Sequence, residues 1–423
     1  MAGVRITAEY LVETPLTLEA AAETMAGEQS TGTFTRVPGE TDELRERFAA
    51  KIESIEQVDS YPTPSLPGAS SPRGGTDYQR GRVRISFPLE NIGPNLPTII
   101  STVAGNLFEL RQLSGLRLLD IEFPAEFAEF FPGPPFGVDG TRRLTGVYDR
   151  PLIGTIVKPS VGLTPLQTAE LVKTLGEAGA DFVKDDELMA NPPHSPFDER
   201  VKEVMKVVHD LADSMGRKLM YAFNITDQLD RMREHHDTVL EAGGTCVMIS
   251  LNSVGFAAVE YLSRRFAIPM HGHRNGWGMY YRHPALGMDF TAYQKLWRLA
   301  GVDQLHVNGL KNKFCETDES VVRSIKACLT PMLGGNLVMP VVSSGQWGGQ
   351  AAETYRQTRT KDLMYLAGGG ILAHPGGLAA GVAAIRQAWE AAANEIPLDE
   401  YALRHPELRQ SLEFFGQLSH AKK

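Results

Sequence analysis

The stretch LIGTIVKPSVGLTPLQTAELVKTLGEAGADFVKDDE (residues 152–187) places one helical pattern between two short apolar runs. The runs LIGTIV (152–157) and ADFVKDDE (180–187) have the length of buried strands, and the second ends in acids. The segment between them begins with Thr164-Pro165-Leu166-Gln167, a capping box with proline at the first helical position, and it ends before Gly179. This order of strand, helix and strand predicts a parallel βαβ unit.

The same alternation continues along the chain, and residues 201–211 carry an apolar stripe at helical spacing. A (β/α)₈ TIM barrel over residues 141–395 is therefore expected, with a doubly wound sheet as the competing arrangement. The apolar runs expected to form its eight strands are LIGTIV (152–157), ADFVKDDE (180–187), LMYAFNI (219–225), CVMISLN (246–252), IPMHGHR (268–274), LHVNG (305–309), VMPVVSS (338–344) and LMYLAGGG (363–370).

The chain before the barrel has a different pattern, which predicts an N-terminal α+β domain over residues 1–140. VRITAEYLVE (4–13) and GRVRISFPLE (81–90) alternate like half-buried strands. Residues 16–26 and 41–53 have helical patterns, and the Pro-, Gly- and Ser-rich residues 60–77 predict a long loop. FFPGPPFGVDGTRRL (130–144) is the expected domain junction, and residues 396–423 are expected to form a C-terminal helical extension.

Composition narrows the functional classes. The chain has 423 residues and a net charge of −9, which disfavours a general nucleic-acid-binding surface. No apolar run is long enough to span a membrane, and the N-terminal residues lack the pattern of a signal peptide. The three cysteines are too few and too scattered for a disulfide framework or a zinc cluster. A reduced cytoplasm is the expected compartment.

Polar residues end nearly every predicted barrel strand, and barrel enzymes place their active sites at these ends. Such consistency favours a catalytic barrel over a structural one. A Gly-rich end after the eighth strand, lined by the end of the seventh, favours a phosphate-binding site. The strand-end residues are Lys158, Lys184, Asp186, Glu187, His271, His273, Arg274, His306, Asn308, Ser343, Ser344, Gly345, Gly368, Gly369 and Gly370.

The end of the second strand, GADFVKDDELM (179–189), carries the strongest signal for a metal. Side chains alternate along a strand, so Lys184 and Asp186 are expected to point the same way, and Glu187 lies where the chain can turn inward. Two carboxylates directed at one point form a hard-oxygen site suited to Mg²⁺. From this stretch alone, a strand end held by salt bridges is the alternative interpretation.

Taken together, these residues resemble the large chain of ribulose-bisphosphate carboxylase, and more closely the RuBisCO-like (form IV) proteins, over residues 20 to 395. GTIVKPSVGL (154–163) is similar to the motif of the first strand, which implies that Lys158 is the proton-abstracting lysine. GADFVKDDE is similar to the metal motif. The resemblance implies that Lys184 captures CO₂ as a carbamate and binds Mg²⁺ together with Asp186 and Glu187.

The resemblance extends to the substrate site and to the assembly. It implies substrate contacts for His273, Arg274 and His306, and phosphate contacts for Ser344, Gly345, Gly368 and Gly369. EQSTGTFT (28–35) and GN (105–106) are similar to segments that reach a neighbouring subunit's barrel, which implies roles for Glu28, Thr33 and Asn106. A homodimer or an assembly of dimers with shared active sites is therefore expected, with no small subunit and no nucleic-acid or membrane partner.

Three departures from the family pattern argue against carboxylation of ribulose bisphosphate. Ser160 replaces a second lysine, Gln346 replaces a glycine beside the phosphate-contacting positions, and the loop NGLKNKFCETDES (308–320) lacks the carboxylase form. Lys313 survives in this loop. Lys313 and Glu28 correspond to a pair that holds the carboxyl group added by carboxylases, so a substrate with its own carboxylate is expected.

The preferred hypothesis is a Mg²⁺-dependent carboxy-lyase (decarboxylase) acting on a phosphorylated keto sugar acid of the 3-oxo-isoapionate 4-phosphate type. The resemblance also allows the methionine-salvage activities, namely the 2,3-diketo-5-methylthiopentyl-1-phosphate enolase and the 5-methylthioribulose-1-phosphate isomerase. A sugar-phosphate-binding protein without catalytic activity is the alternative from another class. It is disfavoured because Lys158, Lys184, Asp186 and Glu187 are all present.

Overall fold

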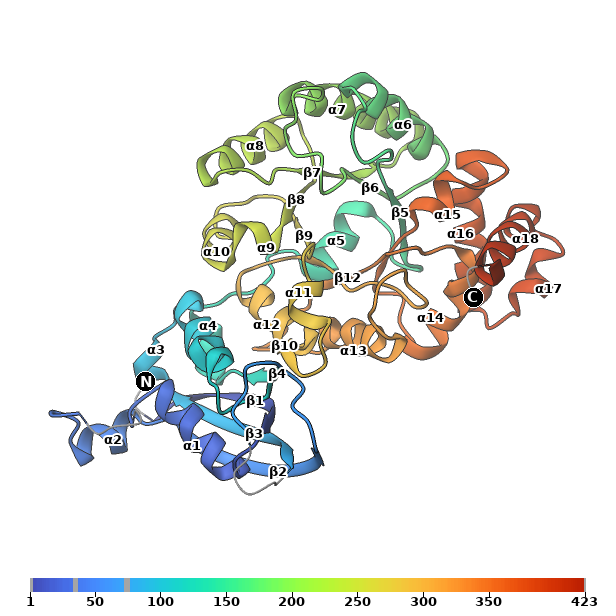
Figure 1. Cartoon of the computed structure of the whole chain (residues 1–423). Helices are drawn as coiled ribbons and strands as arrows, with labels where there is room; N and C mark the ends of the chain where they lie inside the picture. The colour runs from blue at the N-terminus through green and yellow to red at the C-terminus, as the bar shows by residue number, and fades with distance from the viewer. Residues whose placement is uncertain (1–2, 33–36, 72–76, 422–423) are drawn as a thin grey trace. The chain divides into compact units, whose positions relative to one another are not determined.

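The computed structural model of the chain describes residues 3–32, 37–71 and 77–421. Contacts between residues divide the chain into two compact units (Figure 1). The first, here called the N-terminal unit, consists of Met1–Pro132 with Gly276–Ala300. The second, the barrel unit, consists of Gly133–Asn275 with Gly301–Lys423.

A five-stranded sheet with the order β10-β4-β1-β3-β2 forms the centre of the N-terminal unit. β1 pairs antiparallel with β3 and β4, β2 pairs antiparallel with β3, and β10 pairs parallel with β4. α1 packs on β2 and β3. The elements are β1 (Arg5–Thr14), α1 (Leu18–Glu28), α2 (Asp42–Phe48), β2 (Lys51–Tyr61), β3 (Tyr78–Pro88), α3 (Leu89–Ile92), α4 (Leu96–Ala104), η1 (Asn106–Glu109), β4 (Gly115–Glu122), η2 (Ala125–Glu129), α11 (Gly278–Tyr281), β10 (Leu286–Met288) and α12 (Phe290–Leu299).

The strands predicted from alternation in this unit are confirmed as β1 and β3, and the predicted helices are confirmed as α1 and α2. The helical prediction over 41–53 is wrong at its C-terminal end, because β2 begins at Lys51. Most residues of β2 are exposed. Backbone pairing with β3, rather than burial of an apolar face, therefore holds this strand in the sheet. Residues 62–71, the described part of the predicted loop after β2, contain no helix or strand.

Residues 276–300 lie within the chain region predicted to form the barrel, yet they add β10 to the sheet of the N-terminal unit. Arg117 on β4 holds this segment. Its guanidinium donates to Asp289 Oδ1 from Nε (2.9 Å) and Nη2 (2.8 Å), and Nη1 donates to the carbonyls of Tyr281, His283 and Leu286. These long-range contacts leave no local pattern in the sequence. The domain limits predicted from the sequence, 1–140, 141–395 and 396–423, stay predictions.

Eight parallel strands close a barrel in the order β11-β12-β13-β5-β6-β7-β8-β9. Seven strands lie within their predicted apolar runs, and β11 overlaps its run (305–309) but begins one residue earlier, at Gln304. The TIM barrel is therefore confirmed and the doubly wound sheet is wrong. The strands are β5 (Leu152–Ile156), β6 (Phe182–Lys184), β7 (Met220–Asn224), β8 (Cys246–Ser250), β9 (Met270–His273), β11 (Gln304–His306), β12 (Met339–Val342) and β13 (Met364–Leu366).

The helices of the barrel unit follow the predicted signals. Thr164 and Gln167 form the expected capping box at the start of α6, and the stripe predicted in 201–211 is buried on α7. No helix among the described residues has the length and apolar character needed to cross a membrane. The helices are α5 (Gly137–Thr145), α6 (Pro165–Glu177), α7 (Phe197–Met215), α8 (Leu229–Glu241), α9 (Leu251–Val254), α10 (Phe256–Ser263), α13 (Asp318–Leu329), η3 (Gly348–Gln350), α14 (Ala351–Thr358), α15 (Gly368–Leu372), α16 (Gly377–Ala393), α17 (Leu398–Ala402) and α18 (Pro406–Ala421).

Buried apolar side chains from the strands fill the barrel interior, where Leu152, Phe182, Met248 and Met364 belong to one cluster with Val138 of α5. Burying such side chains stabilises a fold by about 1.5–3 kcal/mol each. The clustered side chains belong to the strands whose carboxyl ends carry the polar groups. It therefore provides a rigid base for the side chains described below.

Asp303, directly before β11, connects three backbone segments of the barrel unit. Its Oδ1 accepts from the amides of Phe136 (2.6 Å) and Gly137 (2.9 Å) at the start of α5, and its Oδ2 accepts from Met270 (2.9 Å) on β9. The side chain is buried. Both oxygens must therefore be acceptors for these amides to be satisfied.

Asp303→Asn is expected to destabilise the protein by about 2–4 kcal/mol, because its NH₂ group must face a backbone donor in a buried position. Urea unfolding followed by circular dichroism measures this loss against the exposed substitution Asp213→Asn on α7. An unfolding midpoint equal to that of the control would show that the hydrogen bonds of Asp303 do not stabilise the fold.

Candidate active site

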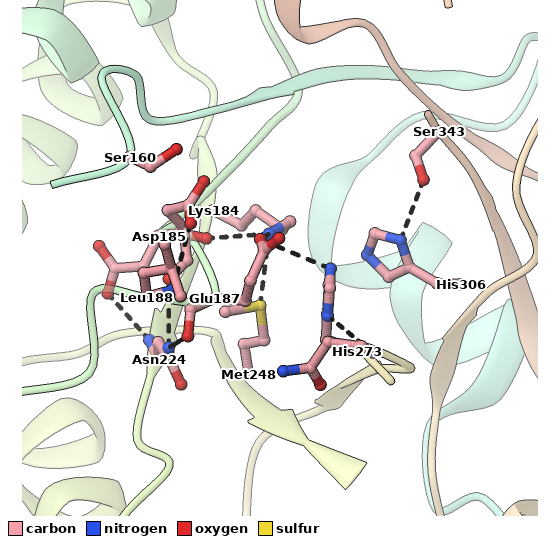
Figure 2. A network of polar contacts seen from close by, with 12 residues as sticks. Ser160, Lys184, Asp185, Glu187, Leu188, Asn224, Met248, His273, His306 and Ser343 are labelled. Atoms are coloured by element: carbon pink, nitrogen blue, oxygen red, sulfur yellow. Dashed lines mark hydrogen bonds and ion pairs between the residues drawn. The ribbon is translucent and has the colours of Figure 1, made fainter. Parts of the chain in front are cut away.

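Polar side chains gather at the carboxyl ends of the barrel strands, and the end of β6 contributes the most (Figure 2). Lys184 is the last residue of β6, and its side chain is only 1% exposed. Its Nζ donates to the carbonyl of Asp185 (3.0 Å), contacts Met248 Sδ (3.5 Å) and lies 3.7 Å from Glu187 Oε2. Burial lowers the pKa of the Lys184 amine, although the charges of Glu187 and Asp186 oppose this effect.

The three acids after Lys184 do not act as one cluster. The carboxylate of Asp185 is occupied by other residues of the barrel unit. It accepts from Tyr221 Oη (2.5 Å), the Asn224 amide (2.9 Å) and Arg200 Nε (3.3 Å). Asp186 lies beyond the end of β6, and its Oδ2 accepts from Lys158 Nζ while its charge acts on Lys184. Of the charged cluster noted in the sequence, Asp185 therefore has a structural role, and Asp186 and Glu187 remain for chemistry.

Asn224, at the end of β7, positions these two acids through their backbone. Its Nδ2 donates to the carbonyls of Asp186 (3.1 Å) and Glu187 (3.2 Å), and Figure 2 shows Asn224 beside Glu187. Asn224 was not among the site residues predicted from the sequence. The available signal was a single amide side chain inside the otherwise apolar run LMYAFNI, at a strand end where other barrel strands carry polar groups.

Lys158, two residues after β5, lies against the acids. Its Nζ donates to Asp186 Oδ2 (2.5 Å) and to Ser160 Oγ (2.8 Å), and its side chain is 42% exposed. The structure thus brings together Lys158 and Asp186, two of the predicted site residues. Ser160, which replaces a lysine of the family pattern, accepts a hydrogen bond from the lysine that remains.

His273, the last residue of β9, faces Glu187 across the site, with its Nε2 3.6 Å from Glu187 Oε2 (Figure 2). Its Nδ1 accepts from the Asn275 amide (3.2 Å), so the neutral ring carries its proton on Nε2. Burial, helped by the positive charge of Lys184, lowers the pKa of His273 to about 3. At neutral pH this ring is therefore an uncharged hydrogen-bond donor.

A chain of hydrogen bonds fixes the proton positions of two further histidines. Gln304 Nε2 donates to Thr141 Oγ1 (3.1 Å), which leaves its Oε1 to accept from His271 Nδ1 (2.9 Å). His271 Nε2 then accepts from His306 Nε2 (2.8 Å), and His306 Nδ1 accepts from Ser343 Oγ (3.1 Å). Burial holds the pKa of both histidines well below the ordinary value, so both rings are neutral.

Arg274, directly after β9, is paired with a residue that sequence analysis did not identify. Its Nη2 lies 2.7 Å from Glu316 Oε2, and both side chains are almost fully buried. Asn308 Nδ2 donates to the same oxygen (2.7 Å), and Asn308 Oδ1 accepts from Ser344 Oγ (2.7 Å). Glu316 belongs to the loop that differs from the carboxylase form, and this difference was the only signal for it.

Gln346, predicted to border the phosphate site, is buried in loop contacts. Its Nε2 donates to the Leu310 carbonyl (3.1 Å), and its Oε1 accepts from Tyr365 Oη (3.2 Å). The side chain packs on Gly309, where an added Cβ would lie 2.2 Å from the Gln346 Cδ atom. Gln346 and Gly309 therefore fit only as a pair, and together they hold the loop after β11.

The remaining predicted residues of the barrel unit line the same strand ends. Gly345 (φ +85°) and Gly369 are exposed, and nothing lies within 4 Å of a Cβ built on Gly369. Gly368 begins α15. Lys313 is exposed, and its Nζ lies 5.2 Å from the centre of the Phe314 ring.

The predicted residues of the N-terminal unit form a pair of their own. Asn106 Nδ2 donates to Glu28 Oε1 (3.2 Å), so these two side chains lie together. Thr33, also predicted to contact substrate, lies outside the described residues.

The side chains at the end of β6 supply some of the ligands that a divalent metal needs. In the described part of the chain, no group of three His, Cys, Asp or Glu side chains is placed to hold an ion. Asp186 and Glu187 supply two carboxylates beside the Lys184 amine, whose charge interacts with both. Mg²⁺ prefers oxygen ligands and retains waters or substrate. These residues therefore fit Mg²⁺ if Lys184 also provides an oxygen.

Comparisons with known proteins match nearly the whole chain to one family. The description "Ribulose bisphosphate carboxylase large chain, catalytic domain" matches residues 137–415, and the N-terminal domain of the same chain matches residues 5–127. The 3-oxo-isoapionate-4-phosphate transcarboxylase/hydrolase of Xanthobacter autotrophicus is 51% identical over 416 residues, which is 97% of this chain and 99% of the relative. The 3-oxo-isoapionate-4-phosphate decarboxylase of Rhizobium rhizogenes is 48% identical over 414 residues (97% and 98%).

The fold comparison gives the same result. A crystal structure of a rubisco-like protein from Burkholderia fungorum matches with a TM-score of 0.91 and 48% identity, covering 97% of this chain and 99% of that one. Both domains, two curated relatives and a solved structure thus agree over nearly the whole chain. The chain belongs to the ribulose bisphosphate carboxylase large-chain family, and within it to the RuBisCO-like proteins.

Proposed function

We propose that this protein decarboxylates 3-oxo-isoapionate 4-phosphate in a Mg²⁺-dependent reaction. The observation that carries the proposal is the Lys158, Lys184, Asp186 and Glu187 centre in a chain 48% identical to a decarboxylase named for that substrate. The methionine-salvage activities are not favoured, because the curated relatives compared above are named for isoapionate chemistry. A protein that only binds sugar phosphates would not require an amine buried beside two acids.

The proposed ligands of Mg²⁺ are Asp186, Glu187 and the carbamate of Lys184. Carbamate formation needs an unprotonated amine, and the lowered pKa of Lys184 favours that form. The new carboxylate would replace a buried cation with an oxygen ligand beside Glu187. When bound, Mg²⁺ would supply Lewis-acid polarisation of the substrate ketone.

The chain's own residues would guide the electron pair and the proton. The bond between the carboxyl carbon and its neighbouring carbon breaks, CO₂ leaves, and the electron pair moves into an enolate. Lys158, with its amine at the acid centre, would deliver the proton that converts this enolate into the product ketone. His273, neutral and protonated on Nε2, would donate a hydrogen bond to the developing negative charge.

The ends of β12 and β13 would hold the substrate's phosphate. Exposed backbone at Gly345 and Gly369, with half-buried Gly368 between β13 and Gly369, leaves room for phosphate oxygens, and Ser344 precedes Gly345. This role rests on the family resemblance, together with the phosphate in the names of the two curated relatives. Lys313, exposed on the neighbouring loop, is proposed to contact the substrate carboxylate.

A homodimer is proposed as the functional form. Glu28 and Asn106 correspond to family residues that reach a neighbouring subunit's barrel, and they already form a hydrogen-bonded pair in the N-terminal unit. Such a pair would enter the partner's site as one preformed element, together with Thr33. Sedimentation analysis of the purified protein tests this assembly.

A second candidate reaction is cleavage of the same substrate by hydrolysis. It is favoured by the 51% identity to a transcarboxylase/hydrolase of the same substrate. Hydrolysis would break a carbon–carbon bond with water and leave a second carboxylic acid, whereas decarboxylation releases CO₂. The two reactions therefore differ in their products.

Incubation of the protein with Mg²⁺, bicarbonate and substrate carrying ¹³C in its carboxyl group separates these candidates. Decarboxylation moves the label into CO₂ and bicarbonate, and in D₂O it places one deuteron on the neighbouring carbon. Hydrolysis keeps the label in an organic acid. Carbon-13 NMR distinguishes the outcomes, and unchanged substrate under these conditions would contradict both reactions.

A further inference from the structure

The buried pair of Arg274 and Glu316 has no role in the chemistry proposed above. Arg274 follows β9 and Glu316 precedes α13, so the pair joins two neighbouring strand-end loops of the barrel unit. Their Nη2 and Oε2 atoms lie 2.7 Å apart, and the side chains are 5% and 2% exposed. Because both charges are withdrawn from water, each depends on the other for compensation.

The carboxylate of Glu316 is fully engaged. Its Oε2 accepts from Arg274 and from Asn308 Nδ2, and its Oε1 accepts from Ser320 Oγ (3.0 Å). Asn308 in turn accepts from Ser344 Oγ, at a position proposed to contact phosphate. The pair is thus part of the hydrogen-bonded lining of the strand ends.

The charge of Arg274 reaches the catalytic groups. It contributes to the lowered pKa of both His273 and His306, which places its guanidinium within electrostatic range of the site. A buried guanidinium at such a position is a strong receptor for a phosphate or a carboxylate. Here the chain itself supplies the anion, since Glu316 already binds the guanidinium.

We propose that Glu316 is a specificity residue that occupies the anion-binding position of Arg274 and restricts the enzyme to substrates with one phosphate. The inference rests on the proposed function and names its substrate class: a phosphate at one end and an uncharged, hydroxyl-bearing group at the other. A second phosphate near Arg274 would meet the like charge of Glu316 in a buried environment. A hydroxyl group at the same place would meet satisfied polar groups and no repulsion.

Two probes that differ by one phosphate test this directly, namely ribulose 5-phosphate and ribulose 1,5-bisphosphate. Their dissociation constants are measured by calorimetry on the wild-type protein with Mg²⁺ and bicarbonate. The wild-type protein is expected to bind the bisphosphate no more tightly than the monophosphate. A bisphosphate bound about tenfold more tightly or better would overturn the proposal, because Glu316 would then be leaving Arg274 free for the ligand.

Glu316→Gln provides the complementary experiment. Its amide oxygen can still accept from Arg274 and Asn308, and its NH₂ can donate to Ser320 Oγ, but the negative charge is removed. The variant is expected to prefer the bisphosphate by about tenfold or more, through a charge-assisted contact with Arg274, whose positive charge Glu316 no longer neutralises. The matched control is Glu319→Gln, an exposed position on α13.

An unchanged ratio of the two constants in Glu316→Gln would show that the pair only fastens the loops, and it would overturn the proposal. If the variant does not fold, the wild-type ratio remains a complete test. The ratio requires no turnover, so its result stands apart from the ¹³C product assay. Absence of CO₂ release together with the expected ratio would refute the proposed reaction and leave the role of Glu316 intact.

Discussion

Lys184→Met is expected to lower turnover by about 10³-fold or more, because methionine cannot form the carbamate that completes the Mg²⁺ ligands. The same substitution is expected to leave the protein at least as stable as the parent. The Lys184 ammonium is buried, its pKa is lowered by that burial, and its side-chain contacts include the sulfur of Met248. Replacing a desolvated cation with an apolar side chain of similar length removes a cost of folding.

Three measurements separate this expectation from a simple loss of structure. Turnover is followed by CO₂ release, stability by urea unfolding, and metal affinity by calorimetry with Mg²⁺ in the presence and absence of bicarbonate. In the parent, bicarbonate should strengthen Mg²⁺ binding, and in Lys184→Met this dependence should vanish. The exposed lysine of α6, Lys173, gives the control Lys173→Met. Bicarbonate-dependent Mg²⁺ binding that persists in Lys184→Met would place the carbamate elsewhere and refute the assigned ligand set.

The sequence predicted the barrel because its signals are local and repeated. Each βα unit carries an apolar run of strand length, and the capping box at Thr164 and the stripe on α7 mark the helices between the runs. The closed topology brings all the strand ends together, so reading those ends also found Lys158, Lys184, Asp186 and His273. For residues at strand ends, the position in the sequence is therefore enough to predict the position in the fold.

The residues that escaped prediction are those defined by distant partners. Glu316 is one of several acids in a polar loop, and only the fold brings it to Arg274, 42 positions earlier in the chain. Asn224 holds the backbone of two acids 38 and 37 positions earlier. β10 is held by pairing with β4 and by the hydrogen bond from Arg117 to Asp289, which directly follows β10. None of these contacts leaves a periodic pattern, so no reading of local composition could locate them.

Two of the three departures from the family pattern, Gln346 and the loop 308–320, are linked by the structure. Gln346 packs on Gly309 and donates to the Leu310 carbonyl, near the start of the loop. Glu316, near the end of the same loop, binds Arg274 and Asn308. Gln346 and Glu316 thus bind residues 308–316 to the strand ends. In place of a carboxylase-like loop, this chain has a loop that these contacts hold against the strand ends, and the Glu316 carboxylate of this loop supplies an anion. These changes are consistent with a substrate smaller and less charged than a sugar bisphosphate.

Lys158→Met is expected to lower kcat by about 10²- to 10⁴-fold, because it removes the proposed proton donor. Lys158 is placed for this role, since its Nζ reaches Asp186 Oδ2 and Ser160 Oγ while the side chain stays 42% exposed. It is not a proposed metal ligand. Bicarbonate-dependent Mg²⁺ binding is therefore expected to persist in this variant, unlike in Lys184→Met, and calorimetry measures that difference.

The fate of the proton provides the sharper test of Lys158. In D₂O the parent should add deuterium to a single face of the carbon that loses CO₂, because one fixed amine delivers it. The residual product of Lys158→Met should carry deuterium on both faces, since solvent would then protonate the enolate. Lys206→Met, at an exposed position on α7, is the control and should match the parent. Single-faced deuteration at a normal rate in Lys158→Met would assign proton delivery to another residue, with neutral His273 as the next group at the site.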